Sequence, residues 1–390
     1  MTPLHEVIIN KKTKLNPIWI MRQAGRYLPE FREIRKSNPN FINLCLNENL
    51  SSEITLQPLK RFNLDAAIIF SDILMLPYGL NQKVEFEKGF GPKLGEVNID
   101  EMSKLDEVDF VQKVYPVYKA IKKVSTNDIV KDKNTIGFVG APWTLLVYII
   151  NQHSPKKNLK KDFFKNDFLI NRILLILEKF LKIHIKNQID NGANVIQIFD
   201  SWAGLLEEKD LPNYVYSPTL NLVNYVKSLN TPVICFPREI KNYKEFCEIV
   251  KPDAVGIDYN VDPKKILNEV KIPIQGGLDP KILLSNKETL KKEAIKSVKE
   301  EALKTSKQGV IAALEGMKRR PSREILLKFP PYPIHIVSGK KDPIIPVSTM
   351  EKQMNRSENV SGIILNKPGH MGHIEAPEEC LRELMWFIKK

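Results

Sequence analysis

The segment PIWIMRQAGRYLPEFREIR near the start of the chain carries two arginines, Arg22 and Arg26, which are separated by Gln23, Ala24 and Gly25. A guanidinium group binds a carboxylate through two hydrogen bonds and stays charged at any physiological pH. Two such groups in one short segment suit a ligand with several carboxylates. For MRQAGR taken alone, a helix start with surface arginines is the competing interpretation.

Further polar residues follow short apolar runs. Asp72 comes after DAAIIF, Tyr148 after NTIGFVG, and Asp200 and Ser201 after NVIQIF, and Asp258 ends AVGID. A single aspartate at such a place is more often a turn or cap residue. The whole set predicts one rim, because the carboxyl ends of parallel strands in a barrel meet at one mouth.

The apolar runs themselves predict the fold. They are short and rich in Val, Ile and Phe, which is typical of strands buried on both faces. Helical patterns such as 171–191, 217–230 and 286–303 separate several of them. We therefore predict an α/β protein with a (β/α)₈ barrel of the TIM type that lacks its native eighth unit. The seven expected strands are PIWIM, DAAIIF, NTIGFVG, NVIQIF, TPVICF, AVGID and PIQGG.

With these segments in order, the chain resembles the uroporphyrinogen decarboxylase family from residue 1 to about residue 295. Gly277 departs from the family, which usually has Asn there. The segments that carry the resemblance are the arginine string, FSDILMLPYGL, FEKGFGP, GFVGAPWTLLVYI, IQIFDSWAGLL, GIDYNVDP and IQGGLDP.

The resemblance implies a decarboxylase without a cofactor or metal, which turns the four acetate arms of uroporphyrinogen into methyls and yields coproporphyrinogen. The substrate is an octacarboxylate tetrapyrrole, so Arg22 and Arg26 would hold or protonate it. Asp72 would face the ring N–H groups and stabilise a cationic pyrrole. The family's other substrate contacts match Gln23, Ala24, Gly25, Tyr148 and Ser201.

From about Lys299 the chain departs from that family, and none of its six histidines stands in the expected Asn-Leu-Gly-His-Gly loop. The tail instead resembles the C-terminal part of an α/β-hydrolase, with Asp342 as triad acid and His370 as base. No Gly-x-Ser-x-Gly elbow exists among the 18 glycines, so both partners lack a nucleophile. We predict two domains, 1–297 and 298–390, from two incomplete enzymes joined near 295–300.

The tail has two competing structural interpretations. In the first, the strand Pro333–Val337 docks as a surrogate eighth barrel strand, with Lys340 near the place of the missing histidine. In the second, the tail forms a small α/β lobe of its own.

Composition narrows the function classes. The net charge of +13 comes mostly from scattered lysines, which does not favour a nucleic-acid surface. Four distant cysteines and the absence of a signal peptide or apolar span predict a cytoplasmic protein that is not bound to membranes. The resemblance implies a homodimer. Three alternative functions are considered: a catalytically silent chimera with a damaged barrel, an ester hydrolase, and a zinc methyltransferase. The His-x-Cys ligands of the last are missing from this sequence.

Overall fold

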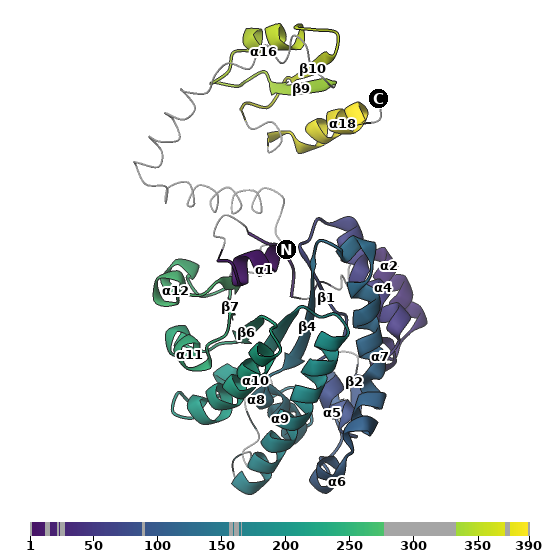
Figure 1. The fold of residues 1–390 in the computed structure, drawn as a ribbon, viewed down its shortest axis with the longest axis vertical. Coiled ribbons are helices and arrows are strands. Elements are labelled where there is room, and N and C mark those ends of the chain that lie inside the picture. Colours follow the sequence, from purple (N-terminus) through teal and green to yellow (C-terminus); the bar gives the residue numbers. More distant parts are fainter. Residues whose placement is uncertain are drawn as a thin grey trace. The chain divides into compact units, whose positions relative to one another are not determined.

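The computed structural model describes residues 2–11, 16–21, 23, 28–87, 90–155, 159, 164, 166–276, 333–370 and 375–388. The chain divides into two compact units, Met1–Ser285 and Asn286–Lys390 (Figure 1). The helical pattern 286–303, Gly277 and the junction near 295–300 lie outside the described residues.

The first unit is built on a parallel sheet of six strands in the order β1-β4-β5-β6-β7-β8. Each neighbouring pair is parallel, and each strand except the last is followed by at least one helix before the next strand of the sheet, as the repeated β-then-α pattern predicts. The strands are β1 (Ala66–Ile68), β4 (Asn134–Gly140), β5 (Val195–Asp200), β6 (Val233–Pro237), β7 (Ala254–Ile257) and β8 (Ile274–Gly276).

Helices surround this sheet, and a short antiparallel hairpin adds β2 (Val84–Glu87) and β3 (Gly91–Leu94). The 3₁₀ turns are η1 (Asp128–Val130) and η3 (Ala203–Leu205), and η4 (Pro212–Tyr216) is a π-helical turn. The α-helices are α1 (Pro3–Ile8), α2 (Pro29–Ser37), α3 (Phe41–Cys45), α4 (Glu48–Arg61), α5 (Met75–Gly79), α6 (Ile99–Lys104), α7 (Glu107–Ser125), α8 (Pro142–Asn151), α9 (Asp167–Asp190), α10 (Ser217–Ser228), α11 (Tyr243–Val250) and α12 (Pro263–Glu269).

The prediction of a first strand at Pro17–Met21 is wrong. Residues 16–21 run beside β1, since Asp65 N donates to Ile18 O at 2.8 Å, but they form no strand. The side chain of Gln23 is the physical reason. Its Nε2 donates to Ala66 O at 2.9 Å and its Oε1 accepts from Ile20 N at 3.2 Å. The amide group thus stands between the two backbones, where a direct ladder bond would otherwise form.

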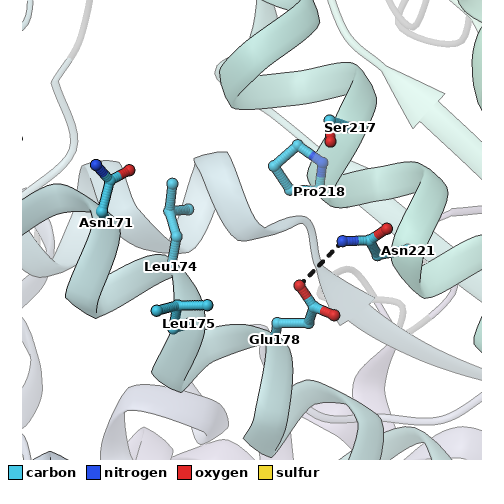
Figure 2. A pocket seen from close by; sticks show the side chains of 7 residues that line it. All are labelled: Asn171, Leu174, Leu175, Glu178, Ser217, Pro218 and Asn221. Atoms are coloured by element: carbon cyan, nitrogen blue, oxygen red, sulfur yellow. Dashed lines mark hydrogen bonds between the residues drawn. The ribbon is translucent and has the colours of Figure 1, made fainter.

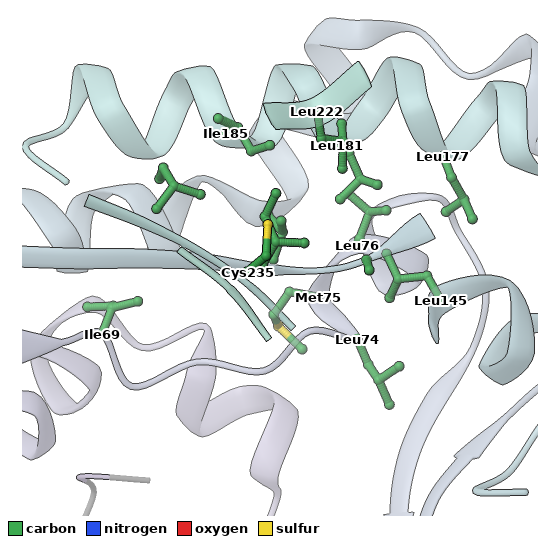
Figure 3. Packing of buried hydrophobic residues seen from close by; sticks show 14 of the residues in the cluster. Ile69, Leu74, Met75, Leu76, Leu145, Leu177, Leu181, Ile185, Leu222 and Cys235 are labelled. Atoms are coloured by element: carbon green, nitrogen blue, oxygen red, sulfur yellow. The ribbon is translucent and has the colours of Figure 1, made fainter. Parts of the chain in front are cut away.

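Alternate strand residues build two separate apolar cores. Ala67 and Ile69 pack with the surrounding helices, where Leu177 and Leu181 of α9 lie against the sheet (Figure 3). Ala66 and Ile68 point to the other face. Their cluster also contains Leu4, Ile8, Ile136, Val195, Ile234 and Ala254. This period of two is what a parallel sheet covered on both faces requires.

Helix α1 covers the amino ends of the central strands. Leu4 N donates to Asn134 Oδ1 at 3.0 Å, and His5 Nε2 bonds to Asn194 O at 2.8 Å. From this helix, Leu4 and Ile8 pack into the second apolar core, the one that contains Ala66 and Ile68. The amino ends of β4 and β5 are therefore closed, which leaves the carboxyl ends as the place for a site.

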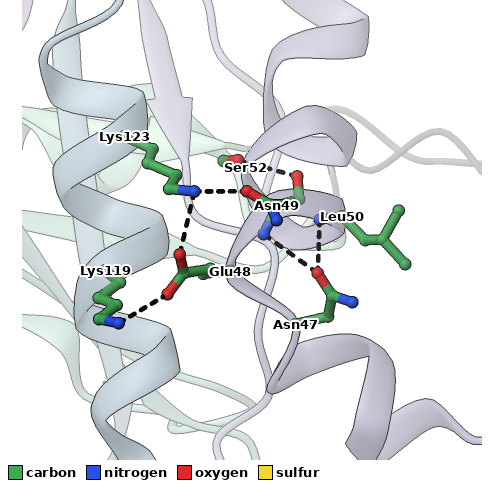
Figure 4. Close-up of polar contacts among 7 residues, drawn as sticks. All are labelled: Asn47, Glu48, Asn49, Leu50, Ser52, Lys119 and Lys123. Carbon is green, nitrogen blue, oxygen red and sulfur yellow. Dashed lines mark hydrogen bonds and ion pairs between the residues drawn. The ribbon is translucent and has the colours of Figure 1, made fainter.

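Helices α4 and α7 are joined by polar contacts at their surface (Figure 4). Glu48 accepts from Lys119 at 3.3 Å and from Lys123 at 3.0 Å, and Lys123 also bonds to Asn49. Asn47 caps α4 by accepting from the amides of the second and third helix residues. Exposed ion pairs of this kind contribute little stability, so the apolar contact beneath them holds the two helices together.

A buried amide side chain links α9 to β4. Gln188 Oε1 accepts from Phe138 N at 2.9 Å and its Nε2 donates to Phe138 O at 3.0 Å. Gln188 is only 1% exposed, so no solvent replaces these bonds. A Cβ added at Gly137 would lie 2.6 Å from the same amide, which explains why a glycine precedes Phe138.

Gln188→Ala is expected to destabilise the protein by about 2–4 kcal/mol, because both polar groups of Phe138 lose their partner and a cavity opens. Urea unfolding followed by circular dichroism measures the change. Asn187→Ala is the control, since the side chain of Asn187 donates to Ile183 O of its own helix. Its cost should stay within about 0.5 kcal/mol. Equal effects of the two substitutions would contradict the account.

The second unit contains two strands and two helices among its described residues. Strands β9 (Ile334–Gly339) and β10 (Val360–Leu365) pair in parallel in a sheet of their own, from Val360 with Ile334 to Leu365 with Gly339. Helices α16 (Val347–Met354) and α18 (Pro377–Ile388) follow the two strands. The interpretation of residues 333–337 as a surrogate eighth barrel strand is therefore wrong, because β9 pairs with β10. The separate α/β lobe accounts for the pairing.

No helix in the described ranges is both long enough and apolar enough to cross a membrane.

Candidate active site

Three neighbouring strands place the candidate residues at their carboxyl ends. Asp72 follows β1, Tyr148 lies in the helix after β4, and Ser201 follows β5. These strands are adjacent in the sheet, in the order β1-β4-β5. A Cβ added at Gly140, the last residue of β4, would lie 3.1 Å from the Cβ of Ile73, so the segments after β1 and β4 touch. The structure brings the three side chains to one edge of the sheet.

Asp72 is held by the turn that it begins. Its Oδ1 accepts from Leu74 N at 2.9 Å, and its carbonyl accepts from Met75 N at 3.1 Å. Its negative charge reaches Cys45, whose thiol pKa is raised well above the ordinary value by burial first and by Asp72 second. The carboxylate is thus a fixed charge at the end of β1, and Cys45 stays a protonated thiol.

Arg22, Ala24, Gly25 and Arg26 lie outside the described residues, whereas Gln23 is described and 5% exposed. Both ends of its amide bond to backbone groups, at Ile20 and Ala66. Gln23, expected as a substrate contact, therefore has a structural task that its sequence position did not reveal. It fastens the beginning of the arginine segment to β1.

Tyr148 is half-buried near the end of α8 and contacts the residue after Ser201. Its ring meets the ring of Trp202 edge to face, with centroids 6.0 Å apart and an angle of 65° between the planes. Ser201 itself is partly exposed and lies between Asp200 and Trp202. Tyr148 and Ser201 are thus linked through Trp202, by a ring contact and by a peptide bond.

Asp200 has a strongly raised pKa. It is 3% exposed, and Oδ1 accepts from Thr144 Oγ1 at 2.6 Å. Burial raises its pKa from 3.8 to about 7, although the hydrogen bonds from Thr144 and from the Trp202 backbone pull it down. The sequence pointed to Asp200 as a rim residue but gave no signal for its bond to Thr144, 56 residues away.

A sequence model described as "Uroporphyrinogen decarboxylase (URO-D)" matches residues 1–315. The chain belongs to the uroporphyrinogen decarboxylase family. A uroporphyrinogen decarboxylase of Rickettsia canadensis (strain McKiel) is 38% identical over 284 residues, which cover 71% of this chain and 84% of that protein. One from Rickettsia bellii (strain RML369-C) is 39% identical over 283 residues, 71% of this chain and 83% of its own length.

A solved structure, the methyltransferase from Methanosarcina mazei, superposes with a TM-score of 0.50 and 15% identity over 63% of this chain and 74% of that chain. This likeness concerns the fold alone. Together with the family match it supports the parallel-strand α/β half-barrel as the framework of a decarboxylase-family barrel. Within the described ranges no group of three or more His, Cys, Asp or Glu is placed to hold a metal ion.

The side chain of Asp258 makes hydrogen bonds that hold neighbouring segments together. Its Oδ2 accepts from Tyr243 Oη at 2.9 Å and from Glu239 N at 2.6 Å. The carboxylate therefore joins the end of β7 to the segment after β6. In this decarboxylase-family chain it shapes the rim, and the simple turn-residue interpretation describes it well.

In the second unit, Asp342 and His370 are brought together although 28 residues separate them. His370 Nδ1 lies 2.8 Å from Asp342 Oδ2. Burial pulls the pKa of Asp342 upward, but hydrogen bonds from Ile345 N, His370 and Ile344 N outweigh it and hold the pKa below its ordinary value. An ionised carboxylate only accepts, so His370 Nδ1 donates to Asp342.

A shallow pocket of about 310 Å³ lies elsewhere in the first unit, between α9 and α10 (Figure 2). Glu178 Oε2 accepts from Asn221 Nδ2 at 3.1 Å across it. Helix residues alone line it, so it is separate from the strand ends. The lining residues are Asn171, Leu174, Leu175, Glu178, Ser217, Pro218 and Asn221.

Asp200→Asn tests the ionisation of this carboxyl group. A folded-state pKa of about 7 means that the folded protein holds the proton more tightly than the unfolded chain. That contribution to stability is complete below pH 4 and is lost as the pH rises to about 7. The neutral amide keeps the acceptor for Thr144 and cannot ionise. The difference in thermal midpoint, variant minus wild type, should therefore increase between pH 4 and 7 and stay constant above pH 7. A difference that is constant with pH would contradict this.

Proposed function

We propose that this chain is a uroporphyrinogen decarboxylase, which converts the four acetate side chains of uroporphyrinogen III to methyls and gives coproporphyrinogen III in porphyrin biosynthesis. The observation that carries the proposal is the family match over residues 1–315, to which the relatives add 38% identity. The placement of Asp72, Tyr148 and Ser201 after adjacent parallel strands supports it.

The chemistry fits the residue types. Loss of CO₂ from a pyrrole acetate leaves an electron pair that needs a sink, and protonation of the ring provides one. A fixed carboxylate then stabilises the cationic pyrrole in a cleft of low dielectric. Asp72 is the residue for this role, because its Oδ1 and carbonyl are held by the turn that follows β1. Arg22 and Arg26 would bind or protonate the substrate carboxylates.

The same proposal includes the setting of the enzyme. The chain would act without a cofactor, in the cytoplasm, and as a homodimer. Analytical ultracentrifugation of the purified chain tests the last point, because a monomer at micromolar concentration would contradict it.

Asp72→Asn is expected to reduce kcat/KM by about 10²–10³, since it removes the charge that faces the developing cation. The assay incubates the protein anaerobically with uroporphyrinogen, oxidises the products and separates the porphyrins by their number of carboxyl groups. Asp128→Asn is the control, because Asp128 is exposed and lies in η1, just before the amino end of β4, whereas the candidate site lies at the carboxyl ends of the strands. It should leave kcat/KM within about twofold.

Two outcomes would contradict this proposal, the first in its activity and the second in its mechanism. Wild-type protein that is folded but forms no decarboxylated porphyrin would support a catalytically silent chimera. Full activity of Asp72→Asn would remove Asp72 from the mechanism while leaving the activity itself in place.

The tail has a second candidate function. The proposal here is that residues 298–390 derive from an α/β-hydrolase, joined to a decarboxylase barrel of residues 1–297. The hydrogen bond between Asp342 and His370 and the order strand, acid, strand, histidine support it. Without a nucleophile elbow the pair forms two thirds of a triad, so hydrolysis by this chain is not expected.

A fluorophosphonate probe, which reacts with activated serines, tests this expectation. Wild-type protein should remain unlabelled, and His370→Ala should look the same. Labelling that disappears in His370→Ala would mean that another serine completes the triad, and the tail would then be a hydrolase.

A further inference from the structure

A hydrogen-bond relay joins the end of β5 to the beginning of α8. Thr144 Oγ1 donates to Asp200 Oδ1 at 2.6 Å and accepts from Trp202 N at 3.1 Å. Thr144 is fully buried and Asp200 is 3% exposed, so solvent does not compete for either group. One hydroxyl thus connects a carboxyl group to the backbone two residues beyond it.

Helix α8 also holds the other polar group of the same residue. Trp143 Nε1 donates to Trp202 O at 2.8 Å, so both the N–H and the C=O of Trp202 bond to side chains of α8. Trp143 is itself fixed, because its ring stacks on Phe164 at 8° and meets Tyr214 at 45°. The peptide units that flank Trp202 are therefore set by two consecutive residues of the first helical turn.

Tyr148 stands one turn after Thr144 on the same helix face. Its ring contacts the indole of Trp202, and Ser201 is the residue between Asp200 and Trp202. The relay therefore adjoins Ser201 and Tyr148, the two side chains expected to contact the substrate. Neither Asp200 nor Thr144 has to reach the substrate to affect them.

We infer that Asp200 and Thr144 are positioning residues, which lock the Ser201–Trp202 backbone onto α8 and so fix Ser201 and Tyr148 relative to each other. The inference rests on the proposed decarboxylase function. A hydroxyl suits the place because it donates and accepts at once, and valine of the same shape does neither.

Kinetics of Thr144→Val and Thr144→Ser form the first arm of the test. Thr144→Val should lower kcat/KM for uroporphyrinogen between about tenfold and a hundredfold, with a loss in kcat, because the contacts are displaced rather than removed. Thr144→Ser should stay within about threefold, because it keeps the hydroxyl. Thr219→Val is the matched control, since Thr219 is 2% exposed and its hydroxyl bonds to no other described residue. Equal losses in Thr144→Val and Thr219→Val would overturn the inference.

The second arm needs no activity. The four tryptophans are labelled with 5-fluorotryptophan, and the ¹⁹F signal of Trp202 is assigned by its loss in Trp202→Phe. Thr144→Val should shift or broaden that signal, and Thr144→Ser and Thr219→Val should not. An unchanged signal in Thr144→Val overturns the lock. If wild-type protein proves inactive, the proposed function fails, and this arm still decides whether the lock exists.

Asp200→Asn separates positioning from proton donation and remains informative if Thr144→Val does not fold. The amide accepts from Thr144 but is no acid, so kcat/KM should stay within about threefold. A loss of a hundredfold or more with an unchanged Trp202 signal would make Asp200 an acid in the reaction and overturn its positioning role.

Discussion

Parallel strands that run side by side must end at the same edge, and the rest of the first unit depends on this constraint. The register of β1 with β4 and of β4 with β5 brings Asp72, helix α8 and Ser201 together, although 129 residues separate the first from the last. The opposite edge is covered by α1 through Asn134 and Asn194. The carboxyl ends are therefore the place for the candidate site.

Much of this arrangement could be predicted because it is periodic. Short apolar runs identified the six strands of the sheet, and family strings identified the residues after them. The failure at Pro17–Met21 has a local cause. The apolar pattern is that of a strand, but Gln23 puts its amide where a ladder bond belongs. A side chain that competes with the backbone leaves no mark on hydrophobic periodicity.

The relay from Asp200 to Trp202 was out of reach for a similar reason. Asp200 could be placed at the rim from its position after a strand, whereas Thr144 is an unremarkable residue in the first turn of a helix. Their pairing depends on how α8 packs against β5. Residue spacing within a single helix or strand does not predict that packing. In the tail, by contrast, Asp342 and His370 follow the two strands β9 and β10, and the bond between their side chains agrees with that order.

The neutral state of Asp200 has a consequence for the long-range field of the barrel. The octacarboxylate of the proposed function would approach a protein of net charge +13, so attraction between them would assist the encounter. A carboxyl group with a pKa of about 7 is mostly uncharged at lower pH, where it can support the rim with little opposition to that attraction. Above pH 7 the same group becomes an anion at the end of β5. Ionisation of Asp200 should then lower the rate of ligand association and change how that rate depends on ionic strength. The rate of the chemical step should respond less.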